Sequence, residues 1–168
     1  MTPTSEYRTI SLTHGLVAIV DVVDYERVSQ FTWYAQRSRG KDFYAFRATS
    51  RAKGMKRRLI SMHRFVLGAE DSPLHVDHLN HNTLDNRKLN LRLATNQQNH
   101  HNMKLSKANK SGFKGVYWQK DMEKFAASIK LSGEKIMLGY FPEARDAALA
   151  YDAKAKELFG EFAFLNFP

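Results

Sequence analysis

Side chains that could hydrolyse a phosphodiester gather in residues 75–102. This stretch begins HVDHLNHN at His75, includes LDN at Leu84, and ends with NLRLATNQQNHHN from Asn90. Hydrolysis of a phosphodiester needs an activated water, a cation beside the phosphate and stabilisation of the leaving 3′ oxygen. Histidine is a natural base near neutral pH, and carboxylate and amide oxygens can hold Mg²⁺ while leaving positions for water and phosphate.

The same stretch predicts a strand, a loop, a second strand and a helix that would position these groups. HVDHL has strand character, the polar residues 80–88 suit a loop, and NLRLA can return as the second strand. Thr95 suits the N-cap of a helix TNQQNHHN, and Asn99 lies about one turn into that helix. Convergence of the first strand and the helix on one ion is a geometric hypothesis.

The short motifs MHR, VDH, LDN, NLR and QN, in this order between about residues 61 and 102, resemble the HNH homing endonucleases. That family shares a ββα-metal core. The resemblance implies that Asp77 and Asn99 are the protein ligands of a divalent metal, that His78 is the general base, and that Asn90 braces the loop. It makes Arg92 a candidate phosphate contact.

Two points stay open within this motif. The third letter of HNH is Asn here instead of His, a variation seen among phage and intron members, and Asn96 and His100 are alternatives to Asn99. Further histidines could suggest a structural zinc site, but histidines beside a nuclease centre more often contact phosphate or pack. The roles of these residues are left open: His63, His75, His81, His100 and His101.

Composition restricts the chemistry and the partners. The 168 residues include no cysteine, which excludes disulfides, thiolate zinc sites and cysteine nucleophiles. The remaining ligand types favour a hard ion, Mg²⁺ first and Mn²⁺ as an alternative, and nothing indicates a small-molecule cofactor. There is no apolar run of the ~18 residues that a membrane span needs. We therefore expect a protein in the cytoplasm of a bacterial or phage-infected host cell.

The formal net charge of +9 favours a polyanionic partner, because Lys and Arg that neutralise phosphates release counterions. The excess lies before residue 111, since basic and acidic residues balance over 111–168. Residues 1–60 read as a small antiparallel sheet with hairpin connections at Gly40 and Gly54. The predicted DNA contacts of this region, which could instead form a solvated hairpin face, are Arg51, Lys53, Lys56, Arg57 and Arg58.

Residues 103–112 read as a polar, basic linker, and residues 113–168 as a separate module after a nuclease core at 61–102. FKGVYWQK, KFAASIKL and KIMLGYF are β-rich runs, and Ala147, Tyr151, Ala155 and Leu158 recur at helical spacing before Gly160, with Pro142 expected in the first turn. We predict three strands packed on one helix, with the other face of the sheet free.

FKGV, FAASI, LGYF, AALAYD and the closing LNFP resemble the DNA-binding domain of the plant Apetala and ethylene-response factors. In that family the sheet lies in the DNA major groove. Several of the corresponding strand positions depart from the plant pattern, so the plant target sequence is not carried over. The resemblance implies DNA contacts, unless the strand lysines only serve solubility, at Lys114, Tyr117, Gln119, Ser128 and Lys130.

Together these features predict an α+β protein with an N-terminal sheet, a central ββα-metal core and a C-terminal sheet packed on one helix. The predicted function is endonucleolytic cleavage of double-stranded DNA at a recognised site, leaving 5′-phosphate and 3′-hydroxyl ends. One catalytic unit per chain predicts a nick by a monomer, although a dimer is not excluded. The alternatives are a DNA-binding regulator on an inactive nuclease scaffold and, less favoured, an RNA-binding protein.

Overall fold

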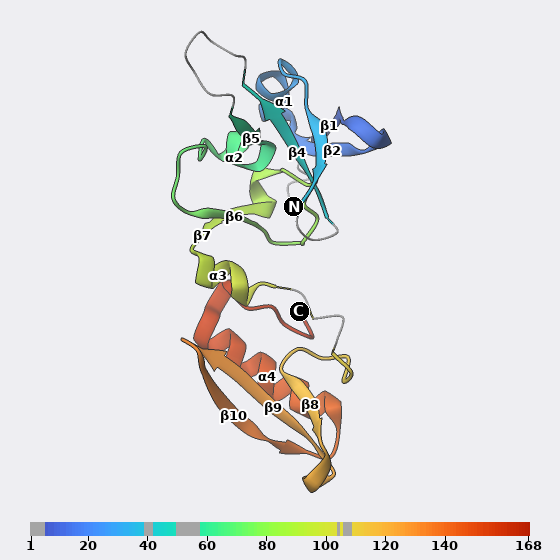
Figure 1. Cartoon of the computed structure of the whole chain (residues 1–168), viewed down its shortest axis with the longest axis vertical. Helices are drawn as coiled ribbons and strands as arrows, with labels where there is room; N and C mark the ends of the chain where they lie inside the picture. Colours follow the sequence, from blue (N-terminus) through green and yellow to red (C-terminus); the bar gives the residue numbers. More distant parts are fainter. Residues whose placement is uncertain (1–5, 39–41, 50–57, 104, 106–108) are drawn as a thin grey trace. The chain divides into compact units, whose positions relative to one another are not determined.

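The computed structural model describes residues 6–38, 42–49, 58–103, 105 and 109–168. The chain divides into two compact units, Met1–Thr95 and Asn96–Pro168. Each combines helices with small antiparallel sheets, in agreement with the predicted α+β class (Figure 1). No helix in the described ranges is long and apolar enough to cross a membrane.

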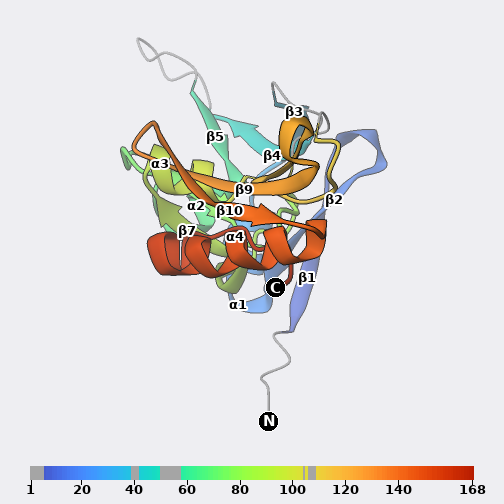
Figure 2. The same ribbon diagram turned by 90° about the horizontal axis from the view of Figure 1, so that it is seen from below.

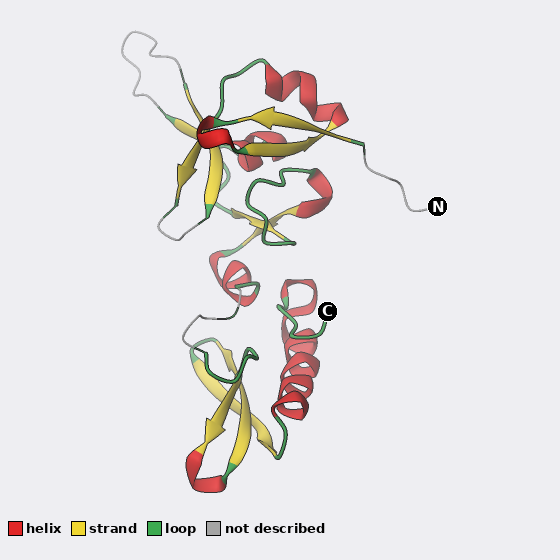
Figure 3. Ribbon diagram, turned by 90° about the vertical axis from the view of Figure 1, so that its right-hand side faces the viewer, coloured by secondary structure: helices red, strands yellow, loops and turns green. Residues whose placement is uncertain are grey.

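In the first unit, the strands pair as antiparallel neighbours along the chain (Figure 3). They are β1 (Tyr7–Ser11) with β2 (Val17–Asp21), then β3 (Tyr34–Arg37) with β4 (Phe43–Ala48) and β5 (Leu59–Ser61), then β6 (His75–His78) with β7 (Leu91–Ala94). The helical elements are α1 (Val22–Ser29), α2 (Met62–Leu67) and the 3₁₀ turns η1 (Thr13–Gly15) and η2 (Lys88–Asn90). Gly68 ends α2 in the left-handed conformation, as its sequence predicts.

The core of this unit joins the N-terminal hairpin, α1, α2 and β7. Met62, Val20 and Val28 are fully buried there beside Trp33 and Phe65. The indole N–H of Trp33 donates to the carbonyl of Val28 at 2.9 Å, which satisfies its one polar group inside the core. Four other aromatic residues of this region are half-buried: Tyr34, Phe43, Tyr44 and Phe46.

In the second unit, one long helix covers one face of a three-stranded sheet (Figure 2). The elements are α3 (Asn96–His101), β8 (Val116–Gln119), η3 (Lys120–Met122), β9 (Lys124–Leu131), β10 (Glu134–Phe141), α4 (Ala144–Phe159) and η4 (Gly160–Phe162). Val116, Ala127, Ile129 and Tyr151 pack between α4 and the sheet. Pro142 precedes the N-cap Glu143 and therefore lies just before the helix. The prediction that it lies in the first turn is wrong.

A hydrogen-bonded corner closes the second unit. The buried carboxylate of Asp152 on α4 accepts from the backbone N–H groups of Asn166 and Phe167, each at 2.9 Å, and from the Asn166 amide at 2.9 Å. The Asn166 side chain in turn accepts from the backbone N–H of Lys114 at 2.7 Å. The end of the chain is therefore tied both to α4 and to the segment before β8.

Gly115 makes this corner possible. Its φ is +77°, and a Cβ placed on it would overlap the ring of Tyr151. Gly112 has a nearly equal φ of +80° but open space around it. The two positions thus share the conformational requirement for glycine and differ in the space available.

We expect Gly115→Ala to lower the free energy of unfolding by about 2 kcal/mol more than Gly112→Ala. Both substitutions strain a left-handed backbone, by about 1–2 kcal/mol, but Gly115→Ala also forces Tyr151 out of place, as overpacked cores do. Urea unfolding of the full chain followed by circular dichroism would measure the difference. Equal losses in the two variants would contradict the steric argument.

Candidate active site

Asp77 and His78 are the last two residues of β6, and both are buried, with 6% and 5% of their surface exposed. In the antiparallel pairing with β7, Asp77 lies opposite Arg92 and His78 opposite Leu91. Polar groups withdrawn from water to this degree need specific partners. The contacts around these two residues therefore define the site.

Arg92 holds the carboxylate of Asp77. Its Nε and Nη2 atoms both donate to Oδ2, at 2.9 and 2.7 Å, and the side chains of both residues are largely shielded from solvent. The predicted phosphate contact thus lies directly beside the predicted metal ligand. Two hydrogen bonds from a planar guanidinium to one oxygen fix the orientation of the carboxylate.

Two aromatic rings from other elements lie beside the ring of His78. The His63 ring of α2 contacts it edge to face with centroids 5.3 Å apart, and the Tyr44 ring of β4 lies at 6.0 Å. Nε2 of His63 is 3.0 Å from the Ser61 hydroxyl, which fixes the orientation of the ring. Neither Tyr44 nor His63 was assigned a role from sequence, although His63 belongs to the MHR motif.

Burial dominates the titration of these rings. It lowers the pKa of His78 to about 4, although the charge of Asp77 and a hydrogen bond to Asn86 act in the opposite direction. Burial, aided by the positive charges of His78 and Arg64, lowers the pKa of His63 to about 3. Burial also raises the pKa of the Tyr44 phenol, further raised by Asp42 and Asp77. His63 and His78 are therefore neutral at physiological pH.

Asn90 joins the two ends of the loop that connects β6 and β7. Its side-chain oxygen accepts from the backbone N–H of Asn80 at 2.9 Å, and its amide donates to the carbonyl of Asp85 at 2.8 Å. Its own carbonyl accepts from the N–H of Leu79 at 2.9 Å. Asn90 therefore connects the two ends of the loop by hydrogen bonds, and its role in the nuclease site stays a prediction.

The loop is organised around the buried carboxylate of Asp85. Arg87 donates to both of its oxygens, from Nε at 2.8 Å and from Nη2 at 2.7 Å, and Asn80 donates to Oδ2 at 2.9 Å. Burial alone would raise the pKa of Asp85, but the hydrogen bonds and charge of Arg87 lower it overall. The LDN motif contained this residue, but its structural role could not be seen in the sequence.

The first sheet of the unit supports the loop from outside. Ile19 of β2 donates its N–H to Leu84 and accepts from the N–H of Asn86, both at 2.8 Å, in an isolated parallel bridge. Lys88 reaches across to α1, where its Nζ lies 3.0 and 2.9 Å from the oxygens of Asp24. The N-terminal hairpin and α1 are thus part of the scaffold of the site.

The donor types fit a hard divalent cation. Asp77 offers a carboxylate oxygen and Asn99 an amide oxygen, and Mg²⁺ accepts few protein oxygens and completes its shell with water. Within the described residues, no three His, Asp or Glu side chains gather as a metal cluster, so such an ion would have few protein ligands. Asn99 lies half-buried on α3 in the second unit. Its convergence with Asp77 remains a prediction.

The predicted DNA contacts lie in different surroundings. Tyr117, Gln119, Ser128 and Lys130 alternate with the core residues of β8 and β9 and so share the sheet face that α4 leaves open. Lys114 precedes β8, and its Nζ donates to two carbonyls within the second unit. Arg58 pairs with Asp71 at 2.6 Å on the surface. The others lie outside the described residues: Arg51, Lys53, Lys56 and Arg57.

Asp77 and His78 lie within a stretch of the chain that matches a known family. The family model described as HNH endonuclease matches residues 62–101. An uncharacterized HNH endonuclease of Acanthamoeba polyphaga mimivirus is 34% identical over 157 residues, which cover 90% of this chain and 75% of the relative. Protein 3.8 of Escherichia phage T7 is 32% identical over 107 residues, 64% of this chain and 88% of the relative.

A shorter similarity concerns plant proteins. The dehydration-responsive element-binding protein 2A of Arabidopsis thaliana is 45% identical over 58 residues, which cover 33% of this chain and 17% of the relative. No solved structure matches the chain. The mimiviral relative aligns along most of both sequences, and the family model covers α2, β6, β7 and α3 with the loop between the strands. The chain belongs to the HNH endonuclease family.

Proposed function

We propose that this protein is a metal-dependent endonuclease of the homing type that cuts double-stranded DNA at a recognised site. The observation that carries the proposal is the pair Asp77–His78, buried at the end of β6 and followed by a loop that Asn90 connects by hydrogen bonds to Asn80 and Asp85. Membership of the HNH family supports a DNA substrate. The viral relatives support action on DNA, and we propose that it takes place in the cytoplasm of a bacterial or phage-infected host cell.

In this proposal His78 takes a proton from the attacking water. Its lowered pKa keeps the imidazole neutral, so the ring has a lone pair available at physiological pH. The contacts with Tyr44 and His63 limit the orientations of the ring. Asn90 acts indirectly, because it fixes the loop between the two strands rather than touching the substrate.

Asp77 and Asn99 would hold one divalent ion, Mg²⁺ or Mn²⁺. When bound, such an ion supplies positive charge to the scissile phosphate and to the leaving 3′ oxygen. Arg92 orients the Asp77 carboxylate for this purpose, and a phosphate contact by Arg92 is the other role that we propose. The products are 5′-phosphate and 3′-hydroxyl ends.

The C-terminal sheet supplies recognition in this proposal. Tyr117, Gln119, Ser128 and Lys130 lie on its open face, and Lys135 adds a cation there through its 2.8 Å hydrogen bond to the Tyr117 hydroxyl. The partial similarity to plant proteins named for binding a DNA element supports an Apetala-like module here. The basic residues between positions 51 and 58 would add contacts to the DNA phosphates that do not depend on the DNA sequence. One active centre per chain predicts a nick by a monomer.

We expect His78→Ala to reduce nicking of supercoiled plasmid by about 10²–10⁴-fold, the usual contribution of a general base. Conversion to open circles with Mg²⁺ or Mn²⁺ is the measurement, and electrophoretic shift titrations should give an unchanged DNA affinity. His14→Asn is the control, because His14 is exposed in the turn η1 and its left-handed φ of 62° suits asparagine.

Full activity of a folded His78→Ala protein would refute the base assignment. Absence of nicking by the wild-type protein with both metals, together with tight DNA binding, would favour the regulator on an inactive nuclease scaffold. Circular dichroism of each variant separates loss of chemistry from loss of fold.

The burial of His63 predicts a pH-dependent stability. A folded-state pKa of about 3, against an ordinary value of 6.5, means that the unfolded chain binds a proton more readily. The free energy of unfolding should therefore fall as the pH drops from 6.5 towards 3, with a contribution from His63 of about 1.4 kcal/mol per pH unit once the unfolded form is protonated.

His63→Gln should flatten this dependence, since it removes the titrating ring and keeps a group that can hydrogen-bond to Ser61. Urea unfolding at pH 7, 6, 5 and 4.5 gives the slopes for both proteins. His78 contributes a dependence of the same sign in both, so the difference between the slopes reports His63. Identical slopes would show that His63 is not a buried neutral ring.

A further inference from the structure

Helix α3 cannot be stable through its own sequence or packing. It has six residues, none of them buried, and its sequence NQQNHH lacks strong apolar groups. Isolated helices of this length are unstable in water because nucleation is costly. The residues that follow the helix supply donors to two of its last carbonyls, Asn102 to Gln98 at 3.3 Å and Met103 to His100 at 3.2 Å, whereas the carbonyl of His101 needs a donor from elsewhere. Contacts outside α3 therefore determine its position.

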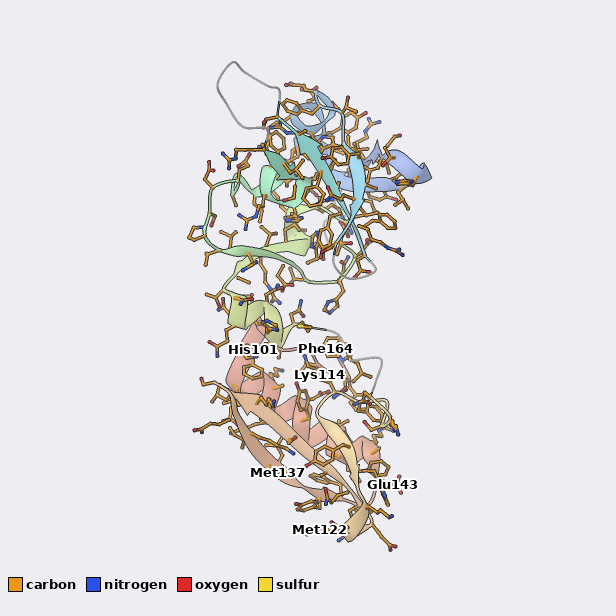
Figure 4. All side chains as sticks on the ribbon, in the orientation of Figure 1. His101, Lys114, Met122, Met137, Glu143 and Phe164 are labelled. Atoms are coloured by element: carbon orange, nitrogen blue, oxygen red, sulfur yellow. The ribbon has the colours of Figure 1, made fainter. Side chains whose placement is uncertain are left out.

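Those contacts come from the C-terminal module. Lys114 Nζ donates to the carbonyls of His101 and Met103, each at 2.7 Å, and so caps the end of α3 with a positive charge. The His101 carbonyl also accepts from the backbone N–H of Phe164 at 3.4 Å. The His101 ring stacks on Phe159 of α4, with centroids 3.6 Å apart. His101, Lys114 and Phe164 meet at the same end of the module in Figure 4.

Lys114 is itself fixed in the module. Its backbone N–H and carbonyl both bond to the side chain of Asn166, which the buried Asp152 of α4 holds in turn. Burial lowers the pKa of the Lys114 ammonium to about 8, as expected for a charge withdrawn from water to serve a specific partner. A continuous set of hydrogen bonds thus runs from α4 to α3.

A cavity of about 690 Å³ lies along α3. Both ends of the helix line it, through Asn96 and Gln97 and through His100 and His101, and the module contributes Lys114 and Phe159 among its other lining residues. The contacts of Lys114 and Phe159 with α3 lie at His101, the C-terminal residue of the helix.

We propose that Lys114 is a positioning residue for the nuclease site, through which the C-terminal DNA-binding module holds α3 and thereby Asn99. This inference rests on the proposed role of Asn99 as a metal ligand. Only Thr95 lies between β7 and α3 along the chain. In this proposal the C-terminal module fixes the helix that carries Asn99.

The test uses the full-length chain with Lys114→Met, which keeps the length of the side chain and removes its charge, and Lys114→Arg, which keeps the donors. Lys156→Met is the matched control, because it removes an exposed charge from α4. Lys114→Met should raise amide hydrogen exchange in α3 by about tenfold or more, from loss of two charge-assisted hydrogen bonds. Lys114→Arg should restore protection, and Lys156→Met should leave it unchanged.

Kinetics separate positioning from DNA contact. Lys114→Met should lower kcat for nicking by about tenfold to a hundredfold, as misplaced groups do, with KM and DNA affinity unchanged. Unchanged α3 exchange would overturn the inference. So would weaker DNA binding with an unchanged kcat and a salt slope reduced by about 1, since this would make Lys114 a phosphate contact. If the wild-type protein does not nick DNA at all, the proposed function itself fails, and this outcome is distinct from both.

Discussion

The geometry of the site depends on one buried negative charge, the carboxylate of Asp85. A carboxylate removed from water is stable only when it is paired and hydrogen-bonded, and Arg87 and Asn80 provide these bonds. Because both partners lie in the same loop, satisfying the charge also sets the path of the backbone. That path brings the carbonyl of Asp85 to Asn90 and the backbone of Asn86 to β2. The strands β6 and β7 are then joined by a connection with little freedom.

A rigid connection matters because partners of Asp77 and His78 come from other elements of the fold. His78 lies under two other rings, and Asp77 is oriented by Arg92 from the neighbouring strand. Each of these partners belongs to a different element, so the site forms only when β4, α2, β6 and β7 are all assembled. Folding also buries the His78 imidazole, and burial lowers its pKa so that the ring is neutral at physiological pH. The same packing therefore orders the site and sets the protonation state of His78.

The sequence was sufficient for features with a local cause. The period of the apolar residues, the turn residues and the glycine after α2 located the hairpins, the helices α2 and α4 and the strands β6 and β7. The approximate span of the nuclease motif also agrees with the family match. Features with a non-local cause were not predictable in this way. The contact of His63 with His78 and the bridge from Ile19 to Asp85 join residues far apart in the chain. The backbone of Lys114 is held by a hydrogen bond to Asn166, at the other end of the module.

The single residue between β7 and α3 has a consequence for how such chains can be recombined. The polar stretch 103–112 has the composition of a linker, yet the boundary between the two compact units falls at Thr95. An exchange of C-terminal segments at the polar stretch would separate α3 from Lys114. An exchange at Thr95 would keep them together. A chimera that preserves the contacts of α3 would therefore have to be joined inside the stretch that matches the family model.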